Sequence, residues 1–244
     1  MESWRDEGVL LSTRRHGEGA AILEVFTPRH GRHLGVMHGG ASRRMAPVLQ
    51  PGAQLSLEWR ARIPEHMGAF RAEPIRSRAD AIMSGPATLA AMVSVAALLR
   101  MLTPERDPLP ELYGATLELM EALGTDPRWP ELYAGWEMGL LAELGFGLDL
   151  TRCAATGAMQ ELIWVSPKSG RAVSRAAGAP YADKLLPLPG FLRGVDGGAP
   201  AEGLRITGHF LRQWALPALG HAHLPDARAR LVDLLTRADP PQQA

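Results

Sequence analysis

Hydrophobic and polar positions alternate in the first part of the chain, and this period of two predicts β-strands. The pattern is clearest over residues 54–62, where Leu55, Leu57 and Trp59 alternate with polar side chains. Glycine and proline residues between the candidates favour turns. The predicted strands span residues 8–13, 20–27, 33–38, 54–62 and 69–76. So many strands in so short a stretch predict a small barrel of OB or SH3 type, because closure removes exposed strand edges.

After residue 80 the apolar positions recur every three or four residues, which predicts helices. Pro86 favours a helix start, and the following residues to position 102 are apolar nearly all round, as in the centre of a bundle. Further helices are predicted at residues 111–123, 131–144, 201–219 and 226–237. Residues 153–189 are rich in Gly, Ser and Pro and predict turns and short hairpins. The polar tail, residues 240–244, is expected to fray.

Composition narrows the class of protein. The 244 residues suit one large domain or two small ones, and 46% hydrophobic residues exclude a disordered or collagen-like chain. Cys153 is the single cysteine, which excludes an internal disulfide framework and fits a reducing compartment. The charged first eight residues precede no signal-peptide core, and the longest apolar stretch, residues 87–99, is too short to span a bilayer. We therefore expect a cytoplasmic protein.

The formal net charge of zero conceals an uneven distribution. Residues 81–150 carry three Arg against ten acidic residues, whereas residues 1–80 carry twelve Arg against nine. The densest basic segment contains Arg14, Arg15, Arg29, Arg32, Arg43 and Arg44. Such a field favours a partner with phosphates or carboxylates, and in an OB barrel these arginines lie on the side that binds oligonucleotides. The alternative is a solvated surface of mixed charge.

Signatures of other chemistry are incomplete. The sequence contains neither a Walker A motif nor a Gly-x-Ser-x-Gly elbow. Cys153 is distant in sequence from every histidine, so we interpret it as an inert buried thiol rather than the nucleophile of a hydrolase. The histidines at positions 30, 33 and 38, and those at 221 and 223, lack a carboxylate or thiolate to complete a metal site, so we expect no metal. Phe26, Trp59 and Phe70 are candidates for base stacking but are expected in the core.

Several longer stretches resemble one known family. Near the start they are Trp4-x-x-Glu7-Gly8-x-x-Leu11-Ser12-x-Arg14-x-x-Gly17-Glu18, Leu23-x-Val25-Phe26-Thr27 and Gly31-Arg32-His33-x-Gly35. Further along they are Trp136-Glu137, Leu141-x-Glu143-Leu144-Gly145-Phe146-Gly147-Leu148-Asp149-Leu150, Cys153-Ala154-x-Thr156-Gly157, Trp164-Val165-Ser166-Pro167 and Gly178-Ala179-Pro180-Tyr181. Together they cover residues 4 to about 193 and resemble the RecO family of recombinational repair mediators.

This resemblance implies an α+β fold. An N-terminal five-stranded OB-fold barrel is expected over residues 1–78, and a mainly α-helical domain over residues 79–244. Within it, residues 151–190 are expected to form a small insertion, zinc-finger-like but depleted of cysteine. Some RecO proteins carry a four-cysteine zinc site that begins at the position of Cys153, but here Thr156 occupies the second ligand position and no later cysteine follows, so we expect no zinc. Trp164 and Tyr181 are expected to anchor this segment by packing.

The resemblance also implies a non-enzymatic function without a cofactor. RecO proteins bind single- and double-stranded DNA, anneal complementary strands, bind RecR and contact the single-strand binding protein, so that RecA loads in a RecFOR-type pathway. The six arginines are the expected DNA-binding residues. A hydrophobic groove between helices over residues 87–144, rimmed by arginines such as Arg100 or Arg128, is a candidate site for an acidic, apolar tail such as that of the single-strand binding protein; the alternative is that these helices simply form a core. We expect a cytoplasmic, nucleoid-associated protein with no membrane partner. The alternative is a protein-interaction scaffold of the same fold with weak or no DNA binding.

Overall fold

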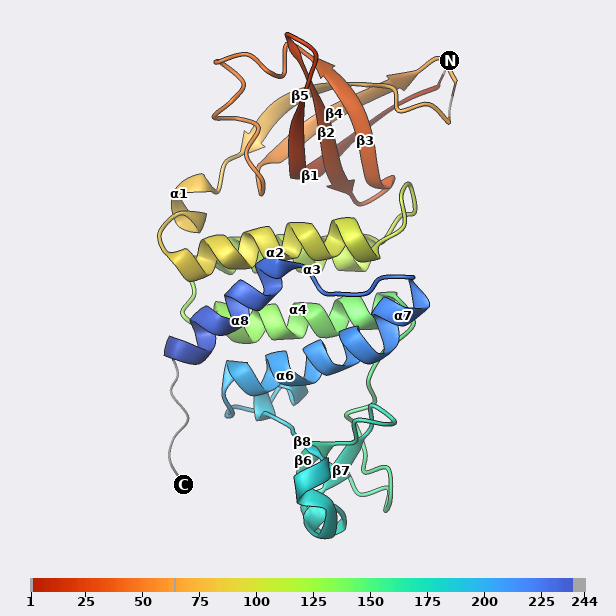
Figure 1. Cartoon of the computed structure of the whole chain (residues 1–244), viewed down its shortest axis with the longest axis vertical. Coiled ribbons are helices and arrows are strands. Elements are labelled where there is room, and N and C mark those ends of the chain that lie inside the picture. Colours follow the sequence, from red (N-terminus) through yellow and green to blue (C-terminus); the bar gives the residue numbers. More distant parts are fainter. Residues whose placement is uncertain (1, 64, 239–244) are drawn as a thin grey trace. The chain divides into compact units, whose positions relative to one another are not determined.

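A computed structural model describes residues 2–63 and 65–238 of the chain. Packing divides the chain into two compact units, residues 1–125 and 126–244. The first unit combines a barrel with three helices, and the second combines helices with a small sheet (Figure 1). The domain boundary expected after residue 78 divides the chain at a different place from this one, and it stays a prediction. The tail at residues 240–244 lies outside the described residues.

Five strands of the first unit form a closed barrel in the order β1-β2-β3-β5-β4. They are β1 Glu2–His16, β2 Ala20–Thr27, β3 Gly31–His38, β4 Gln54–Ala61 and β5 Ala69–Arg76. All neighbouring strands are antiparallel except β3 and β5, which are parallel. The expected five-stranded barrel of OB type is confirmed, and the mainly helical remainder confirms the α+β class.

The barrel interior is filled by alternate side chains of each strand. In β4, Leu55, Leu57 and Trp59 are buried, whereas Ser56 and Arg60 are exposed and Glu58 is half-buried. This is the alternation that predicted the strand, and it continues across the barrel to Phe70 of β5. Trp59 and Phe70 therefore belong to the core, and buried Phe26 packs outside the barrel against Tyr113, with ring centroids 5.7 Å apart. All three were weighed as stacking residues, and the structure confirms that they are packing residues.

Strand β1 is long because it pairs with two partners in succession. Its first half pairs with β4, from Glu2 opposite Ala61 onwards, and its second half pairs with β2 as far as His16 opposite Ala20. The register with β2 shifts between Leu10 and Ser12, which is a β-bulge. A bulge bends a strand, and here it lets β1 leave one neighbour and join the next. The sequence predicted only residues 8–13 because the first half of β1 is charged.

The seam between β3 and β5 is covered by the segment that follows the second helix. Val36 and Ala69 are the residue pair that joins these two strands. Beside the start of β3, Arg32 forms a bridge with Glu105, and the backbone N–H of Arg106 donates to the carbonyl of Arg32 at 2.8 Å. Gly31 has a φ of +61°, and a Cβ there would lie 2.1 Å from the carbonyl oxygen of Asp107. A side chain at this position would collide with the backbone of Asp107, so glycine lets this segment lie against the start of β3.

Three helices complete the first unit: α1 Ala79–Ile82, α2 Pro86–Leu102 and α3 Pro110–Ala122. Figure 1 shows α2 lying across one end of the barrel. Arg78 joins the strands to the helices although it is only 6% exposed. Its guanidinium donates to the carbonyl of Gly52 at 3.2 Å and to the carboxylate of Glu121 on α3 at 2.8 Å. This ion pair explains how an arginine is tolerated in a buried position.

The second unit combines helical segments with a three-stranded sheet in the order β7-β6-β8. Its elements are α4 Trp129–Glu143, β6 Leu162–Val165, β7 Ala172–Ser174, α5 Arg175–Gly178, η1 Ala179–Lys184, β8 Leu186–Pro187, η2 Gly190–Arg193, α6 Pro200–Phe210, η3 Leu211–Ala215, α7 Leu216–Ala218 and α8 Asp226–Ala238. None of the helices within residues 2–63 and 65–238 has the length and hydropathy of a membrane span.

Two expectations for the second unit need correction. The single helix expected over residues 201–219 is three segments, because η3 is a π-helical turn that precedes Pro217, which has no N–H to donate within a regular helix. Tyr181 is 58% exposed, so the expectation that it anchors the small sheet is wrong. Trp164 does pack there: a Cβ added at Gly178 would lie 2.4 Å from its ring.

A buried ion pair fastens the last helix to this unit. Glu137 of α4 is fully buried and Arg228 of α8 is 3% exposed. The guanidinium of Arg228 donates to both carboxylate oxygens of Glu137, at 2.7 and 2.8 Å, and to the carbonyl of Leu204 at 2.9 Å. Thr207 of α6 also donates to Glu137, at 2.5 Å. Since each charge is satisfied only by groups on other helices, the network fixes how α4, α6 and α8 pack.

Replacing Glu137 with Ala would leave the guanidinium of Arg228 buried without its carboxylate. We expect Glu137→Ala to lower the free energy of unfolding by about 3–5 kcal/mol. Urea unfolding followed by circular dichroism measures this loss. Glu143→Ala, at an exposed position of the same helix, is the control and should change stability by less than about 0.5 kcal/mol. Equal losses for the two variants would contradict the role given to the buried pair.

Candidate nucleic-acid interface

One end of the barrel carries four of the six candidate arginines. Arg14 and Arg15 lie near the end of β1, opposite Ile22 and Ala21 of β2, and both are exposed. The connection from β1 to β2 turns at Gly17, whose φ is +62°. The backbone N–H of Ala41 donates to the carbonyl of Gly19 at 3.4 Å, so the segment after β3 lies beside this connection. The two parts of the sequence that hold these arginines therefore meet.

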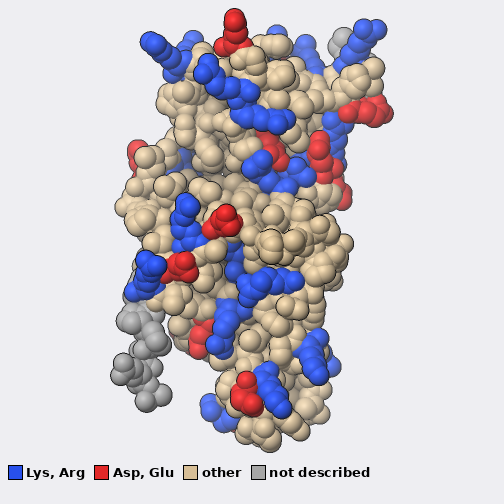
Figure 2. All heavy atoms as spheres, in the orientation of Figure 1, with Lys and Arg blue, Asp and Glu red and all other residues tan. Residues whose placement is uncertain are grey.

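Arg43 and Arg44 are held outward by the apolar residues that follow them. The segment after β3 is a series of turns, in which the N–H of Leu49 donates to the carbonyl of Met45 at 2.9 Å. Met45 and Val48 pack against the barrel core, and Leu49 is buried. Because these side chains occupy the inner side of the segment, the two arginines project into solvent. Figure 2 shows basic side chains protruding from the barrel.

Among the described residues, these four arginines, which we name the unpaired set, have no carboxylate partner. Within residues 2–63 and 65–238, no acidic oxygen lies within 4 Å of Arg14, Arg15, Arg43 or Arg44. An exposed guanidinium without an internal partner keeps its donors and its full charge for an external anion. The unpaired set is therefore the part of the barrel best suited to bind phosphates.

Arg29 is engaged with a buried carboxylate at the β2–β3 turn. Its Nε and Nη2 donate to Asp6 of β1, both at 3.1 Å, and its backbone N–H donates to the same side chain at 3.2 Å. The Asp6 carboxylate also contacts Nδ1 of His30 at 2.9 Å. The first role of Arg29 is thus to neutralise Asp6 and hold the turn against β1. A role in DNA binding stays a prediction for this residue.

Arg32 is engaged in the same way on the outer face of β2 and β3. Its Nη1 donates to Glu24 at 2.8 Å, and its Nε and Nη2 donate to the carbonyl of Thr103 at 3.2 and 3.1 Å. Every nitrogen of its guanidinium therefore has a partner within the protein. For Arg32 too, a role in DNA binding stays a prediction, and the structure adds a packing role that the sequence did not reveal.

An aromatic cluster at the start of β1 was missed by sequence reasoning. The rings of Trp4 and His30 are stacked, 4.1 Å apart and 8° from parallel, and Trp4 also stacks on Trp59 at 5.7 Å. His33 meets Trp59 edge-on at 4.8 Å. These histidines were weighed as metal ligands, but the structure places one on an indole ring and the other in the core. The sequence signal for the core histidine was its place in a predicted strand, on the same face as Gly35 two residues later.

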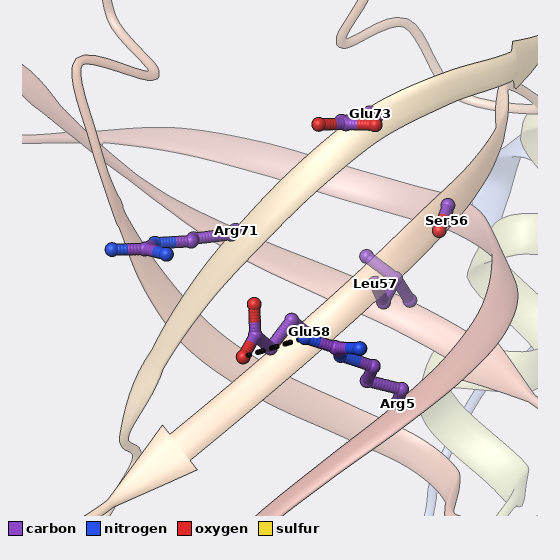
Figure 3. A pocket seen from close by; sticks show the side chains of 6 residues that line it. All are labelled: Arg5, Ser56, Leu57, Glu58, Arg71 and Glu73. Carbon is purple, nitrogen blue, oxygen red and sulfur yellow. Dashed lines mark ion pairs between the residues drawn. The ribbon is translucent and has the colours of Figure 1, made fainter.

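The outer face formed by β1, β4 and β5 carries alternating charges. There Arg5 of β1, Glu58 of β4 and Arg71 of β5 stand in one row across the strands. Figure 3 shows Arg5 reaching Glu58, 3.7 Å away, with Arg71 projecting away from that pair. A hydrogen bond from Arg60 holds the pKa of Glu58 below its usual range. Because acids and bases alternate here, the charges of this face largely compensate one another.

The insertion expected at the zinc position does not fit a zinc ion. Cys153 is 1% exposed, and its Sγ accepts a hydrogen bond from the backbone N–H of Ser174 at 3.3 Å. The hydroxyl of Thr156, at the second ligand position, accepts from the N–H of Ala158 at 3.3 Å. The described residues include no group of three His, Cys, Asp or Glu placed to hold a metal. Hydrogen bonds take the place of metal bonds in this turn.

Two family models match the amino-acid sequence. The model described as Recombination protein O N terminal covers residues 1–78, and the one described as Recombination protein O C terminal covers residues 83–223. The chain belongs to the RecO family. The boundary between the two models falls between β5 and α2, so the unpaired set lies within the part of the RecO family that the N-terminal model describes.

RecO family relatives match over nearly the full chain. A DNA repair protein RecO from Cereibacter sphaeroides is 57% identical over 240 residues, which cover 97% of this chain and 100% of the relative. Those from Roseobacter denitrificans and Ruegeria sp. are 53% and 52% identical over 237 residues, with 96% of this chain and 98% of each relative covered. The family is one of DNA repair and recombination.

His33 makes the stability of the barrel depend on pH. Burial, followed by the nearby positive charges of Arg106 and His30, lowers the pKa of His33 from 6.5 to about 4. The neutral imidazole is therefore stabilised by folding, and this contribution is complete above pH 6.5 and is lost as the pH falls towards 4. We expect His33→Phe to reduce the loss of unfolding free energy between pH 6.5 and 4 by roughly 2–4 kcal/mol. Urea unfolding at a series of pH values measures it.

The matched control is His38→Phe, because His38 is exposed at the end of the same strand. That variant should keep the pH dependence of the unaltered protein. If His33→Phe and the unaltered protein lose stability in parallel as the pH falls, His33 does not carry the proton linkage.

Proposed function

We propose that this chain is a DNA repair and recombination mediator that binds single- and double-stranded DNA through the barrel and acts without catalysing a reaction. The observation that carries the proposal is the unpaired set of arginines at one end of an OB barrel. Exposed guanidinium groups bind phosphate oxygens without reading bases, which suits a protein that must bind DNA of any sequence. Family membership supports the same role.

The proposed mechanism is electrostatic. Each arginine that neutralises a phosphate releases condensed counterions, so affinity falls steeply as salt rises. Two strands bound to one positive surface repel each other less, and this screening favours the annealing of complementary strands. No covalent step is required.

Partners follow from the family rather than from a site in the described residues. We propose that the chain binds RecR and the C-terminal tail of single-strand binding protein, and thereby helps RecA load on covered single strands in the bacterial cytoplasm, at the nucleoid. The groove expected for the tail, rimmed by Arg100 or Arg128, stays a prediction. Arg128 lies 3.8 Å from Asp126 at the start of α4, whereas Arg100 contacts Glu24 on the barrel.

A second candidate is a protein-interaction scaffold of the same fold without DNA binding. The pairing of Arg29 with Asp6 and of Arg32 with Glu24 favours it, because these arginines contribute little net charge to the surface. Fluorescence anisotropy of labelled single-stranded and duplex oligonucleotides over a series of salt concentrations separates the candidates. Tight binding that weakens steeply with salt supports the mediator, and no binding at low salt supports the scaffold.

Replacing Arg14 and Arg15 together with Ala removes two charges of the unpaired set. We expect the slope of log affinity against log salt concentration to become flatter by roughly 1.8 units for duplex DNA, since each phosphate contact contributes about 0.9. Anisotropy titrations measure the slope. A slope equal to that of the unaltered protein would remove both residues from the binding surface.

Paired and unpaired arginines are expected to differ. Arg43→Ala combined with Arg44→Ala should flatten the duplex slope by roughly 1.8 units, whereas Arg29→Ala should flatten it by well under about 0.9, because Asp6 already neutralises that guanidinium. Arg29→Ala should instead lower thermal stability, since it leaves the buried Asp6 with fewer partners. The same salt titrations, together with thermal unfolding, test both statements. Equal loss of slope for each arginine removed would contradict the distinction.

A further inference from the structure

A pocket of about 310 Å³ lies on the outer face of the barrel where the strands meet the end of α2. Ser12 and Arg14 of β1, Glu24 of β2 and Arg32 of β3 line it together with Arg100 from the last turn of α2. The strand register explains why these side chains lie together, because Ser12 stands opposite Glu24, and Arg14 stands opposite Ile22 on the same face. Three guanidinium groups thus surround one carboxylate, for a formal charge of +2.

The carboxylate of Glu24 organises the pocket. Glu24 is 6% exposed, and its Oε1 accepts from Arg32, while its Oε2 accepts from Arg100 Nε at 2.5 Å and from the hydroxyl of Ser12 at 3.1 Å. Arg32 uses its remaining nitrogens on the carbonyl of Thr103. Both oxygens of Glu24 and all three guanidinium nitrogens of Arg32 are therefore occupied.

Donors remain on the other two arginines. Arg100 is half exposed, and within the described part of the chain its two Nη atoms have no hydrogen-bond acceptor; neither has the guanidinium of Arg14. Because Glu24 holds Arg100 by Nε alone, the outer edge of that guanidinium is fixed in orientation and open. A fixed guanidinium edge is the geometry that pairs with two oxygens of a phosphate.

We propose that this pocket binds a phosphate of the nucleic-acid backbone between Arg14 and Arg100, with Glu24 as the residue that positions Arg100. The inference rests on the proposed function and extends the DNA-binding surface beyond the barrel to the end of α2. Continuity favours a polyanion as the ligand: Arg14 belongs both to the pocket and to the unpaired set, so a backbone bound at the end of the barrel leads into the pocket. Ile22 and Leu34, which also line the pocket, suit contact with a sugar ring.

The test compares Arg100→Ala with a matched control, Arg128→Ala, in the full chain. Arg128 is also an exposed arginine beside an acid, but it lies in the second unit. The probe is a fluorescein-labelled oligodeoxythymidylate, titrated at several salt concentrations. We expect Arg100→Ala to flatten the log–log slope by about 0.7, the contribution of one phosphate contact in a single strand, and Arg128→Ala to leave it unchanged.

A second variant tests the proposal independently, in case Arg100→Ala fails to fold. Glu24→Gln keeps hydrogen-bond acceptance for Arg100 and Ser12 but removes the negative charge from the pocket. We expect it to bind the oligonucleotide about threefold more tightly at low salt, with the excess disappearing as salt rises. Thermal unfolding of each variant checks that the barrel is intact.

The possible outcomes distinguish a failure of the proposed function from a failure of the pocket alone. If the unaltered protein binds no oligonucleotide, the proposed function and the pocket fail together. If the Arg14 and Arg15 double variant changes the slope but Arg100→Ala and Glu24→Gln do not, only the pocket is overturned. If Arg100→Ala weakens the binding of a labelled acidic peptide while DNA binding is unchanged, the pocket serves a carboxylate ligand and the phosphate assignment is wrong.

Discussion

The double pairing of β1 is the constraint on which the first unit depends. One strand must serve β4 with its first half and β2 with its second, and the bulge between Leu10 and Ser12 permits the change of partner. Because β2 pairs with β1 and with β3, the turn that follows β1 lies beside the segment that follows β3. The basic end of the barrel is thus a product of strand pairing, since β2 pairs with β1 on one side and with β3 on the other and so places arginines more than twenty-five residues apart in sequence at one end.

Buried carboxylates decide which arginines remain available to a ligand. Asp6 and Glu24 lie on neighbouring strands with little exposure, and a buried charge is tolerated only with partners. Each therefore binds arginines that lie close to it, Arg29 in one case and Arg32 and Arg100 in the other. Of these, Arg100 donates to the carboxylate through Nε, and within the described residues it keeps its two Nη atoms for a ligand. Within the described residues neither carboxylate reaches the arginines at the end of β1, so these stay unpaired. A count of charges along the sequence cannot make this distinction, because paired and unpaired arginines contribute equally to it.

Much of the fold could be predicted because local pattern and final structure agree. The alternation in β4 and the turn residues between strands fixed three strands to within a residue, and Pro86 marked the start of α2. Predictions failed where a distant contact overrides local pattern. The charged first half of β1 is a strand only because β4 pairs with it. The sequence could not predict the partners of Arg29, Arg32 and Arg100 either, since each partner lies on another element.

A chain with no net charge can still bind a polyanion because electrostatic fields are local. At about 0.1 M salt the field of a charge decays over about 10 Å, so acidic residues further away than this do not cancel a basic cluster on the surface. Affinity then depends on how many guanidinium groups within one such distance lack an internal partner. Pairing has a further effect in the pocket at the end of α2. A carboxylate that reduces the local charge also fixes the orientation of Arg100, and a fixed guanidinium loses less side-chain entropy when it binds. Glu24 thus lowers the electrostatic attraction of the pocket for an anion. At the same time it restricts the orientation in which Arg100 binds that anion.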